Sequence, residues 1–540
     1  MIQQMRSDLS KSLLFYRTND LTLKDIITKT MISSGPPAVY QLKTKKEKVE
    51  NLVKITLGDK NEDQSNKTVL LVGETGAGKS TMINALVNYT LGVKFEEEVW
   101  YQIVEKEEEG QTSDVIVYQI FGFEGRTLPF SLTIIDTPGF GDAREIKCDN
   151  IGKKIFALFR SEDGVHQINA VGLVMKASDN RLSDRLMYIF DSVMSLFGKD
   201  LERNIVALIT HSDGRPPKNA LQALEATNIK SSTNEFSYFL FNNCQHEDRT
   251  KDRVFLVRAN ETSLKGCKGF TDFLDKTEPQ PLMITVEVLN ERIRLTACIQ
   301  NLKERIKLNE LKQKEIRQIK EDLNKHEDEM KENKEFTIEV DEPYKDKEPI
   351  KGGMWWLVFY EGAVTCSVCE ENCHYPRCTM AWYPALCQVI KWGRCTVCTN
   401  KCPASDHVKE NWRYVTKTRK VQKTLEKAKQ KHDDDKAECE EKSSRLENLE
   451  EETIKLTTEW SMLLDEAYSH VIRLEEIALK VDSVSTLVHL DFMIEKIKEK
   501  GGQENLLSLQ EKVKKLQKIK SQANKGTKAA LGYAKIYSPK

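Results

Sequence analysis

The segment GETGAGKS at residues 73–80 determines the fold expected of this chain. It fits the pattern G-x-x-x-x-G-K-[ST], in which glycines let the backbone curl so that its amide groups face phosphate oxygens. The apolar run TVLLV at 68–72 predicts a buried strand before it, and residues 81–89 have a helical pattern. A strand, this loop and a helix in that order favour a phosphate-binding loop over the alternative, an ordinary glycine-rich turn.

The polar side chains of this loop have separate expected roles. Lys79 would bridge the β- and γ-phosphates of a nucleotide, and the Ser80 hydroxyl would ligate Mg²⁺. The nucleotide-binding residues predicted in this stretch are Gly73, Thr75, Gly76, Gly78, Lys79, Ser80 and Thr81.

The sequence around the loop alternates between strand and helix patterns. Further apolar runs lie at 115–121, 131–135, 170–175 and 204–210. Helical-period segments such as 183–197 separate them. This order predicts an α/β P-loop G domain with a mostly parallel sheet and helices on both faces. We place it at 66–280, after an amino-terminal extension at 1–65.

The sequence DTPG at 136–139 follows one of these predicted strands. An acid such as Asp136 at the end of a strand can hold Mg²⁺ through water. The Gly139 amide could then sense the γ-phosphate, which would make the following segment a nucleotide-dependent switch. An ordinary turn is the alternative.

The sequence THSD at 210–213 ends the next predicted strand. A carboxylate at Asp213 can accept hydrogen bonds from both N1–H and N2–H of guanine, a pair that adenine does not offer. Asp213 therefore predicts GTP rather than ATP. His211, which occupies a position where lysine is usual, can stack on the purine, and Thr210 completes the predicted site. The alternative is a strand-ending turn with an Asp cap.

The order GETGAGKS, DTPGF, THSD and FNN resembles the septin-related GTPases, and within them the immunity-associated GTPases (GIMAP family). The similarity covers 66–280, under half of the chain. It implies that Asn242 and Asn243 contact the base, and that Thr112 joins Ser80 and Asp136 in the magnesium shell. The cysteine-rich module and coiled coils that follow are similar to those of multidomain relatives.

The resemblance implies a slow or partner-stimulated GTPase that dimerises or polymerises through its G domains, with a possible immune role. Phe140 follows DTPG, where Ras-like enzymes place a glutamine that orients the attacking water. Unaided hydrolysis should therefore be slow. Catalytic help would come from Thr112 or from a neighbouring subunit, for which His166 is a candidate; a structural role for His166 is the alternative.

Eight cysteines lie between residues 366 and 402. Two ligand sets with the same internal spacing lie 29 residues apart: Cys366, Cys369, Cys373 and Cys378, then Cys395, Cys398, Cys402 and His407. Thiolate and imidazole groups are preferred zinc ligands, so the repeat predicts two closed, structural Zn²⁺ sites within 351–423. Disulfide pairing is the alternative.

The pairing of these ligands remains open in the sequence. His374, beside Cys373, is an alternative ligand, and Cys387 has no counterpart in the repeat and could join a site. A crossed arrangement that shares ligands between the two sets is also possible.

Outside these regions the sequence predicts helices. Apolar residues recur every seventh position from Val288, with Asn309 in the same column, and predict a long helix at 281–335 in a coiled coil or a bundle. Residues 336–350 hold two prolines and many charges, as a linker would. A helical or coiled-coil region is expected at 424–525. Its heptad pattern runs from about 424 to 480 and places His470 on the apolar stripe, where a satisfied bundle histidine is favoured over a ligand. A basic tail follows at 526–540.

The composition limits the class of protein. The chain has 540 residues, enough for about three or four domains. Lys+Arg total 82 and Asp+Glu 83, giving a net charge of -1, which provides no specific nucleic-acid signal. We find neither an apolar secretory segment nor a window of 18 apolar residues, so we expect a cytoplasmic protein without a transmembrane segment.

Together these features predict a switch that binds GTP and GDP and self-associates through its G domain and coiled coils. The first rival hypothesis is a non-hydrolysing scaffold, in which nucleotide stabilises an interaction platform of zinc and coils. The second is a zinc-dependent conjugation or adaptor factor that the G domain regulates.

Overall fold

The structure is a computed structural model, and it forms two compact units. The first unit comprises the described residues up to 286 together with 478–484, and the second comprises those in 287–477 and 485–521. The residues that the structure describes are 29–49, 52–105, 115–138, 148–161, 163–178, 190, 192–225, 237–325, 335–350, 354–355, 359–360, 362–378, 383–426, 437–481, 483–500 and 506–521.

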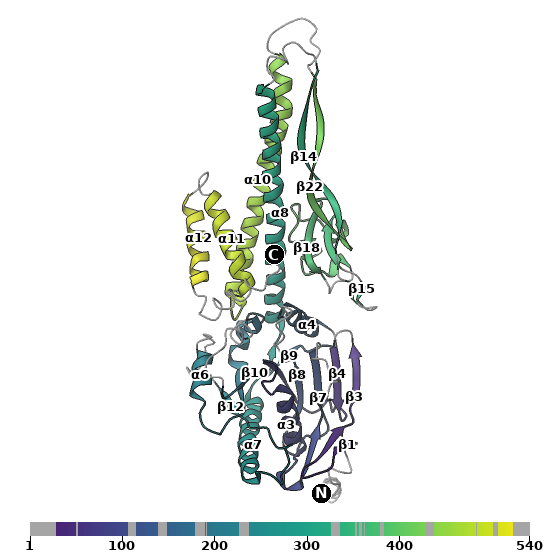
Figure 1. Cartoon of the computed structure of the whole chain (residues 1–540), viewed down its shortest axis with the longest axis vertical. Coiled ribbons are helices and arrows are strands. Elements are labelled where there is room, and N and C mark those ends of the chain that lie inside the picture. The colour runs from purple at the N-terminus through teal and green to yellow at the C-terminus, as the bar shows by residue number, and fades with distance from the viewer. Residues whose placement is uncertain are drawn as a thin grey trace, which may run out of the picture. The chain divides into compact units, whose positions relative to one another are not determined.

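An eight-stranded sheet in the order β12-β11-β10-β5-β8-β7-β4-β3 forms the centre of the first unit (Figure 1). Neighbouring strands from β12 to β8 are parallel, β8 and β7 are antiparallel, and β7 and β4 are parallel again. The strands are β3 (Lys45–Val49), β4 (Leu52–Leu57), β5 (Asn66–Gly73), β7 (Val115–Ile120), β8 (Ser131–Asp136), β10 (Ala170–Lys176), β11 (Ile205–Thr210) and β12 (Tyr238–Leu240). Each apolar run that the sequence predicts to be a strand forms a strand in the structure.

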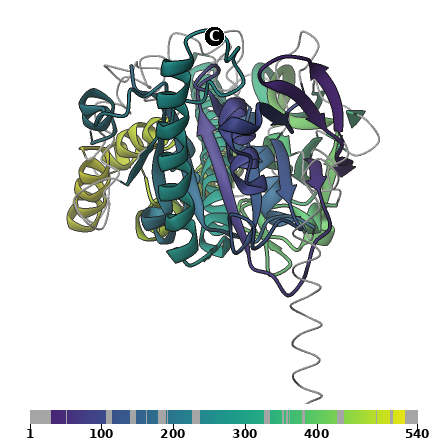
Figure 2. The same cartoon turned by 90° about the horizontal axis from the view of Figure 1, so that it is seen from below.

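Helices cover both faces of this sheet, as can be followed in Figures 1 and 2. Successive residues of β5 point to opposite faces, so Leu71 belongs to one hydrophobic core and Leu70 to the other. The first core includes residues of α3 (Lys79–Leu91) and α7 (Arg253–Lys276), and the second includes residues of α4 (Cys148–Arg160) and α6 (Lys218–Glu225). The predicted α/β fold is therefore confirmed.

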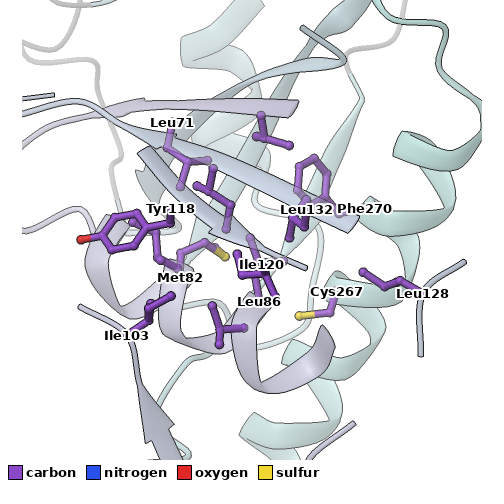
Figure 3. Close-up of a cluster of buried hydrophobic side chains, with 14 of the residues drawn as sticks. Leu71, Met82, Leu86, Ile103, Tyr118, Ile120, Leu128, Leu132, Cys267 and Phe270 are labelled. Atoms are coloured by element: carbon purple, nitrogen blue, oxygen red, sulfur yellow. The ribbon is translucent and has the colours of Figure 1, made fainter. Parts of the chain in front are cut away.

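Figure 3 shows the first core at close range. Met82 and Leu86 of α3 point toward Leu71 of β5, and Cys267 and Phe270 of α7 close the cluster from the other side. All five side chains are buried. This packing fixes α3, and with it the loop that precedes α3, against the carboxyl end of β5.

The sheet begins before residue 66, where we expected the domain to start. Strand β4 pairs with β7 in parallel, and β3 (KKEKV) forms the edge of the sheet. A lysine-rich strand lacks an apolar signature, but it suits an edge because its charges discourage pairing with another chain. Strands β1 (Lys29–Ser33), β2 (Ala38–Leu42) and β6 (Val99–Gln102) form a separate sheet, and β9 (Gln167–Ile168) pairs with β13 (Gln280–Pro281).

Long helices form the second unit. They are α8 (Met283–Lys325), α10 (Ala437–Ile477), α11 (Val484–Lys500) and α12 (Leu506–Ser521). Helix α8 lies against α10, where Cys298 donates to the Leu463 carbonyl oxygen (3.2 Å) and Asn309 to the Thr457 hydroxyl (3.1 Å). The predicted seam of α8 is buried from Val288 to Ile316. Arg292 of α8 donates to the Thr486 hydroxyl of α11 (2.8 Å), and Lys512 of α12 pairs with Asp465 of α10 (2.7 Å), so the arrangement is a bundle.

The segment expected to be a linker is a strand. Strand β14 (Glu335–Pro349) pairs with β22 (Trp412–Glu426) in one unbroken antiparallel register. The charges that suggested a linker pair across the two strands, for example Glu342 with Arg419 and Asp346 with Lys417. Their partners lie more than 70 residues away in the chain, which is why the local sequence did not indicate a strand.

The cysteine-rich region lies between these two long strands. Its short strands are β15 (Met354–Trp355), β16 (Phe359–Tyr360), β17 (Gly362–Cys366), β18 (Glu371–Cys378), β19 (Ile390–Lys391), β20 (Arg394–Cys395) and β21 (His407–Glu410). Strand β17 is the middle of a three-stranded sheet, between β18 and β21.

His470 is a buried histidine with a partner, as predicted. Its Nδ1 lies 2.6 Å from a carboxylate oxygen of Glu291, which also accepts from Arg294 (2.6 Å). Burial raises the pKa of Glu291, but the hydrogen bonds and charges of His470 and Arg294 outweigh it and lower that pKa to about 2.

No helix within the described ranges combines the length and apolar character needed to cross a bilayer.

We expect His489 to make the second unit less stable in mild acid. Burial, helped by the charge of Lys303, lowers the pKa of His489 to about 4 from 6.5. The unfolded chain therefore binds a proton first as the pH falls, so the stability is complete above pH 6.5 and is lost toward pH 4. Between pH 7 and pH 5 the loss should be about 2 kcal/mol.

Urea unfolding followed by circular dichroism at the two pH values measures this loss. Glu291 stays charged in this window, because its pKa is about 2. The His489→Gln variant is the control, since any other titrating group contributes equally to both proteins. An identical pH dependence in the two proteins would contradict the assignment to His489.

Candidate nucleotide site and cysteine module

The backbone of the 73–80 loop is curled as the motif predicts. Gly76 and Gly78 have φ angles of 79° and 95°, in the left-handed region that side chains disfavour. At Gly73 an added Cβ would lie 2.4 Å from the Val174 carbonyl oxygen, so the adjacent strand excludes any side chain. The loop therefore requires glycine for two reasons, conformation and space.

Helix α3 begins at Lys79, directly after the curl. The first amides of a helix have no acceptor inside it, and they carry the positive end of the helix dipole. Ser80 is exposed in this first turn and Thr75 is exposed in the loop. Together these groups present hydrogen-bond donors and a partial positive charge to an anion.

Lys79 lies folded over the loop. Its side chain is 7% exposed, and its Nζ donates to the carbonyl oxygens of Gly73 (2.8 Å) and Glu74 (3.2 Å). Burial lowers the pKa of Lys79, although the charge of Asp136 acts in the opposite direction. A phosphate group in the loop would supply the negative charge that favours the ammonium form.

Asp136 lies beside the loop because β8 is adjacent to β5. It ends β8 opposite Leu71, and its side chain is buried. The next residue, Thr137, donates its hydroxyl to the Leu71 carbonyl oxygen (2.8 Å). The two strand ends are thereby joined where an acid could hold a magnesium ion near Ser80.

Thr210 connects the predicted base-binding motif to the phosphate loop. Its hydroxyl donates to the Ala77 carbonyl oxygen at 2.7 Å, although the two residues are 133 positions apart. His211 follows with a φ of 51° and is exposed. The Asp213 carboxylate is exposed and accepts from the Arg215 amide (2.9 Å). A carboxylate held in this way has a fixed direction.

The FNN motif lies beside the same edge of the sheet. The Ser212 amide donates to the Phe241 carbonyl oxygen (3.0 Å), which joins the two motifs. Ser263 of α7 accepts from the Asn242 amide (3.0 Å) and donates to the Asn243 side chain (2.8 Å). Ser263 was not among the predicted residues. A lone serine in a helix belongs to no motif, so only the position of Ser263 on the buried face of α7 shows its contact with Asn242 and Asn243.

Several predicted residues lie outside the described part of the chain. They are Thr112, Gly139 and Phe140. Their roles stay predictions. His166 is described, and its carbonyl oxygen accepts from the Leu282 amide (2.9 Å).

The cysteine module gathers potential ligands into three groups, and two of these groups combine residues of both repeats. In each group the potential ligand atoms lie within 4.8 Å of one another. The groups are Cys366, Cys369, Cys398 and Cys402; Cys373, Cys395, Cys398 and His407; and His374, Cys378 and Cys387.

This arrangement differs from the pairing by repeat that the spacing favoured. Neither repeat forms a group by itself, and ligand atoms of both repeats meet in two of the three groups, as in the crossed alternative. The physical reason is the sheet: in β17, Cys366 lies opposite His407 of β21 and Glu371 of β18, so the two repeats face each other. Cys378, which the spacing assigned to the first set, lies in a group with His374 and Cys387.

A buried carboxylate joins the cysteine module to α8. Glu371 accepts from Asn301 (2.6 Å) and from the Thr399 hydroxyl (2.7 Å). Arg305 of α8 forms ion pairs with Glu371 and with Glu459 of α10. Separating the partners of a buried ion pair would leave each charge uncompensated, which is costly. This network therefore holds the module in one position on α8.

Residues 67–255 match the AIG1 family. This part of the chain is similar to the G domains of the AIG1 family. The resemblance seen in the motifs is therefore confirmed.

Among curated proteins, septins are similar to the same part of the chain. Septin-1 of Drosophila melanogaster is 28% identical over 169 residues, which cover 29% of this chain and 43% of that protein. Septin-2 of Bos taurus is 30% identical over 184 residues, covering 30% and 47%. The chain thus spans less than half the length of these relatives.

Among solved structures, the chain is similar to Toc33 from Arabidopsis thaliana in complex with Mg²⁺ and GMPPNP. The TM-score is 0.28 at 18% sequence identity, and the match covers 40% of this chain and 88% of Toc33.

Proposed function

We propose that the G domain binds GTP and GDP with Mg²⁺ and acts as a slow GTPase whose hydrolysis increases on self-assembly. The observation that carries this proposal is the hydrogen bond from Thr210 to the Ala77 carbonyl oxygen (2.7 Å). It holds the phosphate loop and the predicted guanine motif in one rigid unit, so that one nucleotide can reach both. The septin-like, AIG1-type character of the domain supports the same activity.

Different residues of the site would bind different parts of the nucleotide. Lys79 moves from the loop carbonyls to the β- and γ-phosphates, and the curled backbone donates to the same oxygens. Ser80 and Asp136 would hold Mg²⁺, the latter through water, and Thr112 would be a further ligand. Asp213 accepts the two guanine donors, and the base lies beside the other residues of these motifs, Thr210, His211, Asn242 and Asn243.

Slow hydrolysis follows from the residue after Gly139. Phe140 has no group that can orient water, so a bound GTP would persist until a second copy contributes catalytic groups. Self-association through the G domain, with helices of the second unit contributing, would provide that copy. A cytoplasmic location and an immune role are further predictions that rest on the sequence.

We also propose that the cysteine module binds Zn²⁺ as a structural element. The Sγ atoms of Cys369 and Cys402 are 3.7 Å apart, and those of Cys378 and Cys387 are 3.8 Å apart. Two sulfurs on a tetrahedral zinc with bonds of about 2.3 Å lie about 3.8 Å apart, whereas a disulfide needs about 2.05 Å. The ligand types and their spacing fit zinc.

A second candidate function is a scaffold that binds nucleotide without hydrolysing it. The network around Glu371 favours it, because a module fixed on α8 by buried charges is suited to present a constant surface. An adaptor or conjugation factor that the G domain regulates is a variant of the same idea.

The Lys79→Ala variant should lose nucleotide binding. A charge-assisted hydrogen bond contributes about 1.5–3 kcal/mol, so the affinity for GTP and GDP should fall by up to about 100-fold. Calorimetric titration with Mg²⁺ measures it, and Lys60→Ala, on an exposed lysine, is the control. Unchanged affinity in Lys79→Ala would refute the phosphate-loop assignment.

The Asp213→Asn variant should prefer xanthine nucleotides over guanine nucleotides. Xanthine carries an oxygen where guanine carries N2–H, and an amide can donate to that oxygen whereas a carboxylate cannot. We expect the ratio of the two affinities to change by about tenfold or more.

Asp248→Asn is the matched control for this exchange. The Asp248 carboxylate also accepts from the amide two residues later, that of Thr250 (3.0 Å), but it is not part of the site. Competition binding with both nucleotides measures the ratio. An equal change of the xanthine-to-guanine affinity ratio in both variants would refute the assignment of Asp213 to guanine recognition.

Hydrolysis should accelerate as the protein concentration rises. Single-turnover hydrolysis of GTP, measured over a range of protein concentrations, tests this, with Lys79→Ala as the background. A rate per domain that rises with concentration supports the assembly-stimulated GTPase. Binding without detectable turnover at any concentration would favour the scaffold instead.

A further inference from the structure

Two of the three ligand groups have one residue in common. Cys398 belongs both to the group with Cys366, Cys369 and Cys402 and to the group with Cys373, Cys395 and His407. Two tetrahedral zinc ions need eight ligand positions, and these two groups offer seven side chains. One ligand must therefore serve both ions, unless one ion takes a ligand from elsewhere.

Cys398 is placed to be that shared ligand. Its side chain is fully buried, and its sulfur lies within 4.8 Å of the ligand atoms of both groups. The Cys402 amide donates to the Cys398 sulfur at 3.2 Å, and the Cys398 amide donates to the Cys395 sulfur at 3.3 Å. Amide donors to sulfur stabilise thiolates, and a thiolate has lone pairs for two metal ions.

The third group combines Cys378 of the first repeat with His374 and Cys387. His374 Nδ1 is 3.1 Å from the Cys387 sulfur, and Cys378 and Cys387 are 3.8 Å apart. Cys387 had no counterpart in the repeat, and the structure now gives it two partners. Three ligands from one imidazole and two thiolates suit a zinc ion whose fourth position takes a further ligand.

We propose that the module binds three zinc ions, two of them bridged by the Cys398 thiolate and the third held by His374, Cys378 and Cys387. This inference rests on the proposed binding of zinc. It differs from the two separate, closed sites that the spacing predicted, because one sulfur joins two sites and a third, three-ligand site is added.

Metal analysis of the purified full-length chain tests the stoichiometry. The wild type should contain about three zinc ions per chain, Cys387→Ser about two, and Cys398→Ser, which lacks a ligand of both bridged sites, fewer than three. Cys267→Ser, a buried cysteine of the G domain, is the control and should retain three. No zinc in the wild type would refute zinc binding itself, whereas two zinc ions with an unchanged Cys387→Ser variant would overturn only the third site.

X-ray absorption of the zinc-loaded wild type tests the bridge even if the Cys398→Ser variant fails to fold. Two ions that share one thiolate, with Zn–S bonds of about 2.3 Å, should lie about 3.8 Å apart and give a zinc–zinc signal. Cadmium-113 NMR of the substituted protein should show two resonances coupled through the shared sulfur. Absence of both signals in a protein that contains zinc would overturn the bridge.

Discussion

The left-handed backbone at Gly76 and Gly78 is the constraint on which the G domain depends. Because no side chain hinders the curl, the chain can turn from β5 into α3 with its amides facing one point. The hydrogen bond from Thr210 to Ala77 then ties this turn to the end of β11. One local conformation thus positions both the phosphate side and the base side of the candidate site.

The second unit depends on a different kind of constraint, a buried charge network. Glu371 and Arg305 lie where an unpaired charge would be costly, so the ion pair specifies how the cysteine module packs on α8. The long hairpin of β14 and β22 adds a second attachment, since Asp341 of β14 forms an ion pair with Lys314 of α8 (3.0 Å). The ligand groups can therefore form on a fixed frame.

Where the sequence misled, the local pattern did not reveal the contacts that decided the structure. The charges of 336–350 looked solvated because their partners on β22 follow the whole cysteine module. Lys45–Val49 looked like part of an extension because an edge strand needs no apolar pattern. Ser263 could not be identified at all, since only the rotation of α7 brings its hydroxyl to Asn242 and Asn243.

The sequence by itself determined the parts whose physics is local. A curl that requires glycine, strands that are apolar along their length and the chemical type of the metal ligands can each be read within a few residues. The tertiary structure alone decided which ligands meet: β17 lies between β18 and β21, which sets Cys366 opposite His407, and Cys398 lies within reach of the ligands of two groups. Spacing along a chain records the order of ligands, and a sheet determines which of them are neighbours.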